Sequence, residues 1–384
     1  MVDSGRLPVG WEVKTIGETT TIYNGGTPKS DQAEYWHGDV FWITPKDMGK
    51  LESIYVSDTS RKISQAGLQK SSAKLIPENS IILSTRAPIG HLAINKVAMA
   101  TNQGCRGLVP KSNLDTKFLL YFLKLNIQLL NELGTGTTFK ELSTNSLAGV
   151  KIPIPPLAEQ KRIVAILDEA FEGCDRVIRN TEKNLANARE IFESYLQNLD
   201  AEKEPLGNLV DIKTGKLDAN AATEDGQYPF FTCSREIYKI GSFAFNCEAI
   251  LLAGNNAVGD FNVKHYKGKF NAYQRTYVIT VNKENRILYR YLYFQMLKSL
   301  KEFKLQSVGT GTKFLKLGMI QGLQMALPSL EKQQEIILTL DKLESETQRL
   351  ETIYRQKLAA LKELKQSILQ KAFTGELTAD KEVA

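Results

Sequence analysis

The side chains of this chain that are best suited to chemistry are basic and amide residues in glycine-rich loops. The loop sequences are NGGTPKS, STRAPIG, KTGKLDANAA and GNNAVG. Arginine can hydrogen-bond a guanine edge through two atoms, and asparagine or glutamine can do the same with adenine. Lysine, threonine and backbone N–H groups in such loops can hold phosphates. These residue types predict binding to double-stranded DNA, and the candidate DNA-binding residues are Lys29, Lys46, Arg86, Gln103, Arg106, Lys140, Lys216, Asn255, Asn256, Gln274, Arg275 and Lys313.

Each candidate also has a plainer interpretation, as a turn residue or as a partner in a structural hydrogen bond. The aromatic residues near the loops are assigned to the hydrophobic core rather than to base stacking; they are Tyr35, Trp36, Trp42, Tyr228 and Phe230.

Motifs for catalysis are missing from the sequence. There is no GxxxxGK[ST] phosphate loop, no HExxH metal motif and no proline-proline-aromatic motif of amino-methyltransferases. The three histidines stand apart from one another, and Cys105 is a weak candidate for a nucleophile. We therefore expect a protein without catalytic residues, without a metal site and without a cofactor of its own.

Basic charge is concentrated in two parts of the chain. The net charge is +6 over 384 residues, and residues 1–155 and 201–329 contribute +4 and +6. Residues 156–200, which separate these two parts, carry a net charge of −3. This distribution suits two modules that bind a polyanion, although solvated surface charge alone would give the same totals.

The composition restricts the class of protein. Hydrophobic residues make up 42% and charged residues 24%, as in ordinary globular proteins with two or three domains at this length. No apolar run is long enough to cross a membrane, and the first residues lack the apolar core of a signal peptide. The four cysteines are widely separated, which argues against a zinc ribbon or a disulfide framework and favours the reducing cytoplasm.

The chain contains an internal repeat. PPLAEQKRIVAILD at residues 155–168 corresponds to PSLEKQQEIILTLD at 328–341, an offset of 173. Upstream, GTGTTF at 134–139 matches GTGTKF at 309–314, and SIILSTRAPIG at 80–90 matches AILLAGNNAVG at 249–259. The repeat predicts a first globule (1–155), a helix (156–200), a second globule (201–329), a second helix (330–375) and a tail (376–384).

The two constant segments carry a heptad pattern of apolar residues. Its predicted seam positions include Leu167, Phe171, Ile178, Leu185, Phe192, Leu340, Leu350, Tyr354, Leu361 and Ile368. We expect two long helices that pair antiparallel within the molecule, with an intermolecular coiled coil as the alternative. Thr181, Thr347 and Lys357 are polar seam positions that either fix the register or lie at a frayed edge. In this arrangement Phe373 should lie close to Trp11.

Each globule is expected to be an α/β (α+β) unit with a mostly antiparallel twisted sheet. Buried strands are predicted in SIILSTRAPIG, AILLAGNNAVG and QRTYVITV. One amphipathic helix is predicted in each of the segments 114–133 and 285–303.

The strings IPIPPLAEQKRIVAILD, LPSLEKQQEIILTLD, SILQKAFTGELT and YWHGDVFWITPKDM resemble the specificity subunit of type I restriction-modification systems. The resemblance covers nearly the whole chain, and the second copy departs from it at Ser329 and Lys332. It implies two target-recognition domains, each reading one half of a bipartite asymmetric DNA site. It also implies helices that set the spacer and bind two modification subunits carrying S-adenosylmethionine. Two restriction subunits, using ATP and Mg²⁺, complete the endonuclease in this family.

Other functions remain open from the sequence. A related system with a fused modification-restriction polypeptide would use a similar specificity subunit. A coiled-coil scaffold would bind protein alone, and a stand-alone methyltransferase would itself bind S-adenosylmethionine.

Overall fold

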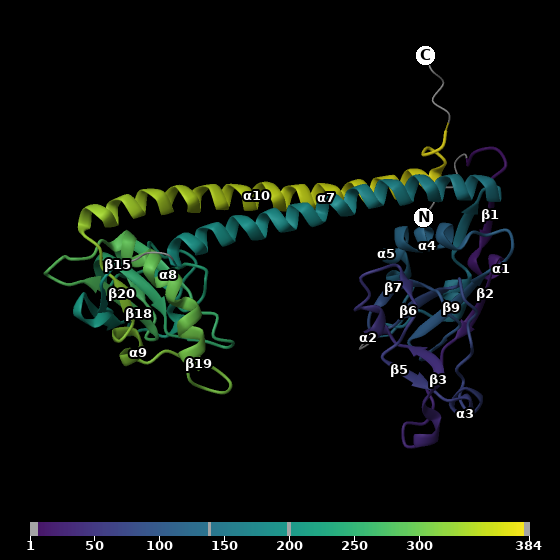
Figure 1. The fold of residues 1–384 in the computed structure, drawn as a ribbon, viewed down its shortest axis with the longest axis horizontal. Coiled ribbons are helices and arrows are strands. Elements are labelled where there is room, and N and C mark those ends of the chain that lie inside the picture. Colours follow the sequence, from purple (N-terminus) through teal and green to yellow (C-terminus); the bar gives the residue numbers. More distant parts are fainter. Residues whose placement is uncertain (1–6, 137–139, 198–200, 380–384) are drawn as a thin grey trace, which may run out of the picture. The chain divides into compact units, whose positions relative to one another are not determined.

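A computed structural model describes residues 7–136, 140–197 and 201–379. The chain divides into two compact units: unit 1 comprises Met1–Arg179 and Lys357–Ala384, and unit 2 comprises Asn180–Gln356. Two long helices pass from one unit to the other, α7 (Leu157–Gln197) and α10 (Leu330–Thr374) (Figure 1). Among the described residues, none of the helices combines the length and apolar character that a membrane crossing needs.

Unit 1 contains a five-stranded sheet, order β2-β9-β6-β7-β4, a three-stranded sheet, order β5-β3-β8, and the pair β1–β10. All pairings are antiparallel except β3–β8 and β4–β7. The elements of its globule are β1 (Glu12–Thr15), α1 (Ile16–Thr19), β2 (Thr20–Asn24), β3 (Trp36–Ile43), α2 (Pro45–Met48), β4 (Tyr55–Val56), β5 (Arg61–Ile63), α3 (Gln65–Gln69), β6 (Ile81–Thr85), β7 (Ile89–Asn95), β8 (Ala100–Thr101), β9 (Cys105–Pro110), α4 (Thr116–Leu125), α5 (Ile127–Glu132), α6 (Thr144–Ala148) and β10 (Lys151–Ile154).

Unit 2 contains a six-stranded sheet, order β12-β18-β15-β17-β13-β14, in which only β13–β17 is parallel. The pairs β11–β20 and β16–β19 are separate. Its elements are β11 (Lys203–Pro205), β12 (Val210–Thr214), β13 (Tyr228–Phe231), β14 (Tyr238–Ile240), β15 (Phe245–Ala253), β16 (Asn255–Asn256), β17 (Val263–Ala272), β18 (Thr276–Val281), α8 (Tyr289–Gln306), β19 (Lys313–Phe314), α9 (Leu317–Gln321) and β20 (Gln324–Ala326). The prediction of α+β globules with mostly antiparallel sheets is confirmed.

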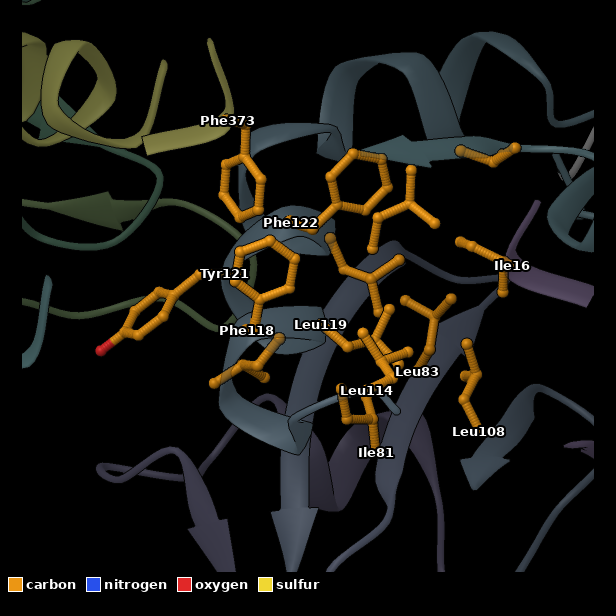
Figure 2. Packing of buried hydrophobic residues seen from close by; sticks show 14 of the residues in the cluster. Ile16, Ile81, Leu83, Leu108, Leu114, Phe118, Leu119, Tyr121, Phe122 and Phe373 are labelled. Carbon is orange, nitrogen blue, oxygen red and sulfur yellow. The ribbon is translucent and has the colours of Figure 1, made fainter. Parts of the chain in front are cut away.

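The core of unit 1 explains why β6 is apolar on both faces. Ile81 and Leu83 of β6 pack with Phe118 and other residues of α4, whereas Ile82 belongs to a separate cluster. A strand covered on both sides carries consecutive apolar residues rather than an alternating pattern. Figure 2 shows the side of this core at which Phe373 of α10 meets α4.

The chain end at α10 lies beside the start of the globule, as predicted. Phe373 is fully buried, and its ring centroid lies 4.9 Å from that of Phe118. Trp11 packs against the same apolar cluster. At Gly375 an added Cβ would come within 2.2 Å of Pro8, so the two segments are in close contact.

The prediction of a single helix over residues 114–133 is wrong. The segment forms two helices, α4 and α5, which are separated by a break at Asn126. The backbone of Asn126 leaves the helical conformation (φ −100°, ψ 17°). Its side-chain Nδ2 donates to the Phe122 carbonyl at 2.8 Å, which competes with the regular helical hydrogen bonds at this point.

The long helices pair antiparallel within each unit. In unit 1 the beginning of α7 and the end of α10 share one apolar cluster, and Lys365 forms an ion pair with Asp175. In unit 2 Arg189 Nε of α7 lies 2.7 Å from Glu351 Oε1 of α10.

The ten predicted seam residues are all buried or half-buried. Leu167, Phe171 and Leu340 are buried, and the remaining seven have intermediate exposure; these are Ile178, Leu185, Phe192, Leu350, Tyr354, Leu361 and Ile368. The heptad pattern also predicts a seam position at Tyr195, which is wrong because this side chain is exposed. Two more predicted positions are wrong in α10, where Lys357 is exposed and Leu364 is 48% exposed. The neighbouring Leu358 and Lys365 are half-buried in their place. Thr181 is buried and Thr347 is half-buried.

Candidate nucleic-acid interface

Three strand ends bring the predicted loops of unit 1 to one edge of its five-stranded sheet. Asn24, the last residue of β2, pairs with Arg106 of β9, and Ser84 of β6 pairs with Cys105. The loops that follow β2 and β6 and the loop that precedes β9 therefore emerge together. Neighbouring strands lie about 4.8 Å apart, so residues from these loops lie within reach of one DNA groove.

Glu141 is the anionic centre of this cluster. Its carboxylate oxygens lie 3.6 Å from Arg86 Nη1 and 3.5 Å from Arg106 Nη2. The backbone joins the same segments, because Leu142 N–H donates to the Thr85 carbonyl at 2.9 Å. Glu141 holds two candidate guanidinium groups together, and sequence reasoning missed it because the link is not local.

The side chains of Arg86 and Arg106 differ in exposure and in the number of contacts that hold them. The Arg106 side chain is only 11% exposed, and it donates to Thr144 Oγ1 and to the carbonyls of Gln103 and Cys105. These contacts suit a residue that fixes the loop. The Arg86 side chain is 36% exposed, and its one ion pair with a described residue is long, at 3.6 Å. Arg86 is thus the better placed of the two to contact a base.

The remaining candidates of unit 1 surround this cluster. Gln103 is exposed and its amide oxygen accepts from Thr27 Oγ1. Lys29, Lys46 and Lys140 are exposed on the loop after β2, on α2 and beside Glu141. A Cβ at Gly104 would contact both Pro45 and Arg86, which places α2 next to the arginines.

Cys105 is not suited to nucleophilic chemistry. It is fully buried at the start of β9 beside Met48, and burial raises the pKa of its thiol to about 12. The thiol therefore stays protonated near neutral pH.

Unit 2 repeats the arrangement of strand ends. Thr214 of β12 pairs with Tyr277 of β18, and Ala253 of β15 pairs with Thr276. The loops 215–222, 254–260 and 273–275 thus lie at one edge of the six-stranded sheet. Lys216 in the first of these loops is exposed.

Arg275 occupies the centre of this second cluster. Its guanidinium lies over the ring of Phe314, 5.2 Å from the centroid. Leu315 N–H donates to the Gly254 carbonyl at 2.9 Å, which repeats the bond between Leu142 and Thr85. Glu141 and Phe314 therefore take equivalent positions, and each contacts an arginine, one by charge and the other through its ring.

The other candidates of unit 2 have well-defined contacts. Gln274 Nε2 donates to Asp218 Oδ1 at 2.6 Å on the surface. Asn255 and Asn256 form β16, which pairs with Phe314 and the half-buried Lys313 of β19. Asn256 Oδ1 also accepts from the backbone of Val258 and Asp260, so its side chain shapes the loop.

In the structure, the residues of GTGTTF and GTGTKF that occupy equivalent positions are not the ones that match in the sequence. Thr135 exchanges backbone hydrogen bonds with Glu141, and Val308 does so with Phe314. Gly136 and Gly309 both have positive φ, 120° and 112°. The offset is therefore 173, as in the helices, and not the 175 of the string match. Thr137, Thr138 and Phe139 of the first string lie outside the described residues.

A half-buried lysine beside the second cluster was not anticipated. Lys264 Nζ donates to the carbonyl of Ser234 at 2.6 Å and to Asn262 Oδ1 at 2.5 Å. Burial lowers the pKa of Lys264. It supports the loop behind Arg275, since Asn262 Nδ2 in turn donates to the carbonyl of Cys233.

The family model and the similar sequences all point to one protein family. Residues 8–187 and 198–360 match the family described as the type I restriction modification DNA specificity domain. The type I restriction enzyme MjaIX specificity subunit of Methanocaldococcus jannaschii is 34% identical over 218 residues, 56% of this chain and 50% of that protein. The EcoDI specificity subunit of Escherichia coli is 42% identical over 46% of this chain and 38% of its own length. The alignments thus span half or less of these two relatives. The EcoprrI specificity subunit of E. coli is 26% identical over 92% of both chains.

Two solved structures share the fold. One, described as the structural basis of complex assembly and conformational transition of the type I R-M system, has a TM-score of 0.75 at 20% identity and covers 97% of this chain and 100% of that chain. The HsdS subunit from Thermoanaerobacter tengcongensis has a TM-score of 0.55 at 19% identity, over 98% and 100%.

Proposed function

Because the chain belongs to the type I restriction modification DNA specificity family, we propose that it is the non-catalytic subunit that gives a restriction-modification complex its DNA sequence specificity. The observation that carries this proposal is the repetition of one arrangement in two units. In each unit three strand ends bring polar and basic loops around an arginine, Arg86 or Arg275, held by the equivalent residues Glu141 and Phe314. Each unit reads one half of a bipartite asymmetric site.

The partners follow from the same proposal. The paired helices α7 and α10 set the unspecified spacer between the half-sites and bind two modification subunits. S-adenosylmethionine is bound by those subunits, and ATP and Mg²⁺ by two restriction subunits that complete the nuclease. The subunit acts in the cytoplasm, where its DNA is found. The scaffold and methyltransferase alternatives gain no support from a family of DNA specificity domains.

Selection from random-sequence duplex DNA tests this function. The full chain, assembled with its modification partner, should enrich two short defined blocks separated by a fixed unspecified gap. Deleting seven residues from both helices, for example 182–188 and 352–358, should change the length of that gap. A soluble complex that enriches no motif would refute DNA reading, and an unchanged gap after the matched deletions would refute the role of the helices as the spacer.

A further inference from the structure

A surface cavity of about 700 Å³ lies in unit 1 beside the paired strands β3 and β5, lined by residues from 30–38 and 58–62. Its walls include Trp36, His37, Thr59, Arg61 and Lys62. None of these residues is among the base-contacting candidates. The cavity combines cations with aromatic rings, which is a composition found where proteins hold nucleic acid.

An irregularity in β3 opens the cavity. Trp36 and Val40 both pair with Ile63 of β5, so residues 37–39 bulge out of the sheet. His37 adopts a positive φ of 60°, and a Cβ on Gly38 would come within 2.4 Å of Ser64 Cα. The bulge therefore presses its backbone onto β5 while the surface beside it stays open. Bulges of this kind often redirect side chains at binding sites.

Arg61 lies in the cavity wall, and its positive charge has no ion-pair partner among the described residues. Its guanidinium lies 5.4 Å from the ring centroid of Trp36 and 4.7 Å from that of Trp42. Trp42 is buried, and its Nε1 donates to the Gly26 carbonyl, so this platform is fixed. Within the described part of the chain, no carboxylate lies within ion-pair distance of Arg61. A stacked guanidinium of this kind keeps its N–H donors available for an anion.

The other charges of the cavity favour an anion as well. Lys62 lies over the ring of Phe41, and its Nζ is 4.0 Å from Asp58, the carboxylate on the cavity wall. Asp58 Oδ1 also accepts from Thr59 N–H at 2.8 Å. The wall thus carries the positive charges of Arg61 and Lys62 and the negative charge of Asp58, which already contacts Lys62 and the Thr59 N–H.

Two hydrogen bonds link the walls of the cavity to segments of the candidate interface. Trp36 Nε1 donates to the carbonyl of Lys29 at 3.1 Å, at the end of the loop that carries Thr27. Ser60 Oγ, on the other side, donates to Asp47 Oδ1 of α2, next to Lys46. A duplex lying on the loops around Arg86 can therefore reach the cavity through its backbone.

We propose that this cavity, the Arg61 site, binds a backbone phosphate of the DNA duplex outside the bases that unit 1 reads. The inference rests on the proposed function. A phosphate fits better than a base, because Arg61 covers the Trp36 ring and Trp42 is buried. The site fixes the position of the duplex and adds affinity for every sequence equally.

Salt-dependent binding tests the Arg61 site. The full chain with its modification partner is titrated with its selected duplex and with a scrambled duplex at several salt concentrations. The double variant Arg61→Ala/Lys62→Ala should bind both duplexes several-fold more weakly, by the same factor. Its slope of log K against log salt should be shallower by about 0.9 for each phosphate that the variant no longer neutralises. Arg61→Lys should restore most of the slope, since it keeps the charge.

Lys151→Ala is the matched control, because Lys151 is exposed on β10 in the same unit. If the double variant matches Lys151→Ala in affinity and slope, the Arg61 site is refuted. A loss confined to the selected duplex would also refute it, because a phosphate contact is blind to sequence. Failure of the unmodified complex to bind either duplex would instead refute the proposed function. Ethylation interference gives a second readout: at least one phosphate whose ethylation blocks the unmodified complex should have no effect on the variant.

Discussion

Gln160 and Gln333 stand 173 residues apart and make the same hydrogen bonds in the two units. The side-chain oxygen of Gln160 accepts from the backbone N–H of Asp115, just before α4, at 2.8 Å. That of Gln333 accepts from the N–H of Leu288, just before α8, also at 2.8 Å. Each Nε2 donates at 2.9 Å to the proline carbonyl five residues earlier, and also to the carbonyl of Asn113 or Arg286. Both glutamines are fully buried. In each unit one amide thus fastens the start of a long helix to its own globule.

Replacing either glutamine should destabilise its unit. Gln160→Ala leaves one half-buried N–H and two carbonyls without their partner, which costs about 1–3 kcal/mol. Because Gln160 and Gln333 lie in different units and share no partner, the two effects should add. Urea unfolding of the single and double variants measures this, with the exposed Gln128→Ala as control. A loss at Gln160 no greater than at Gln128 would contradict the role given to the buried amide.

The two arginine clusters should control different half-sites. Arg86→Ala should relax the preference for the bases read by unit 1, and Arg275→Ala for those read by unit 2. A bidentate contact discriminates by about 1–3 kcal/mol, so preference at one base pair should fall about 10- to 100-fold. Selection and sequencing with each variant tests this, and Arg176→Ala on the exposed face of α7 is the control. Relaxation of both blocks by one variant would be inconsistent with independent reading.

Acid should remove one electrostatic contribution from unit 2. The pKa of Glu248 is lower than its ordinary 4.5: partial burial acts to raise it, but hydrogen bonds from Lys267 and His265 outweigh that effect. A depressed pKa in the folded state stabilises the fold above the unfolded value, and this gain disappears as pH falls through the folded value. The difference in unfolding free energy between the unmodified chain and Glu248→Gln should therefore shrink as the pH falls below 4.5 and through the lower pKa of the folded state. Denaturation at several pH values measures this difference. For Glu224→Gln, a substitution of an exposed residue, the difference in unfolding free energy should not change over the same pH range.

Joining the two ends of this sequence through a linker should preserve unit 1. Gly375 is in close contact with Pro8, so a short linker can bridge the segments around them. A circular permutant with new ends after Gln197 should melt cooperatively at a temperature close to that of the unmodified chain, as followed by circular dichroism. It should also still assemble with the modification partner and select the same two blocks. A permutant that folds but selects neither block would count against the repeat as the functional plan.

The sequence by itself determined the parts of this protein that depend on local periodicity. The 173-residue offset, the two long helices and the mostly antiparallel globules follow from proline positions, heptads and apolar runs, because these patterns act within a few turns or strands. Its resemblance to specificity subunits is confirmed by the matched family. The phase of the second helix was less secure, since adjacent residues such as Lys357 and Leu358 lie only about 100° apart around the axis.

Only the tertiary structure decided which distant residues meet. Arg86, Arg106 and Glu141 come from separate segments, and no local pattern marks Glu141 as their shared partner. The equivalence of Glu141 with Phe314 was hidden for a further reason: a carboxylate and an aromatic ring have no sequence likeness, although both attract a guanidinium. The Arg61 site likewise depends on a bulge that pairs Trp36 and Val40 with one residue. Such contacts are set by strand register and long-range packing, which local sequence patterns do not encode.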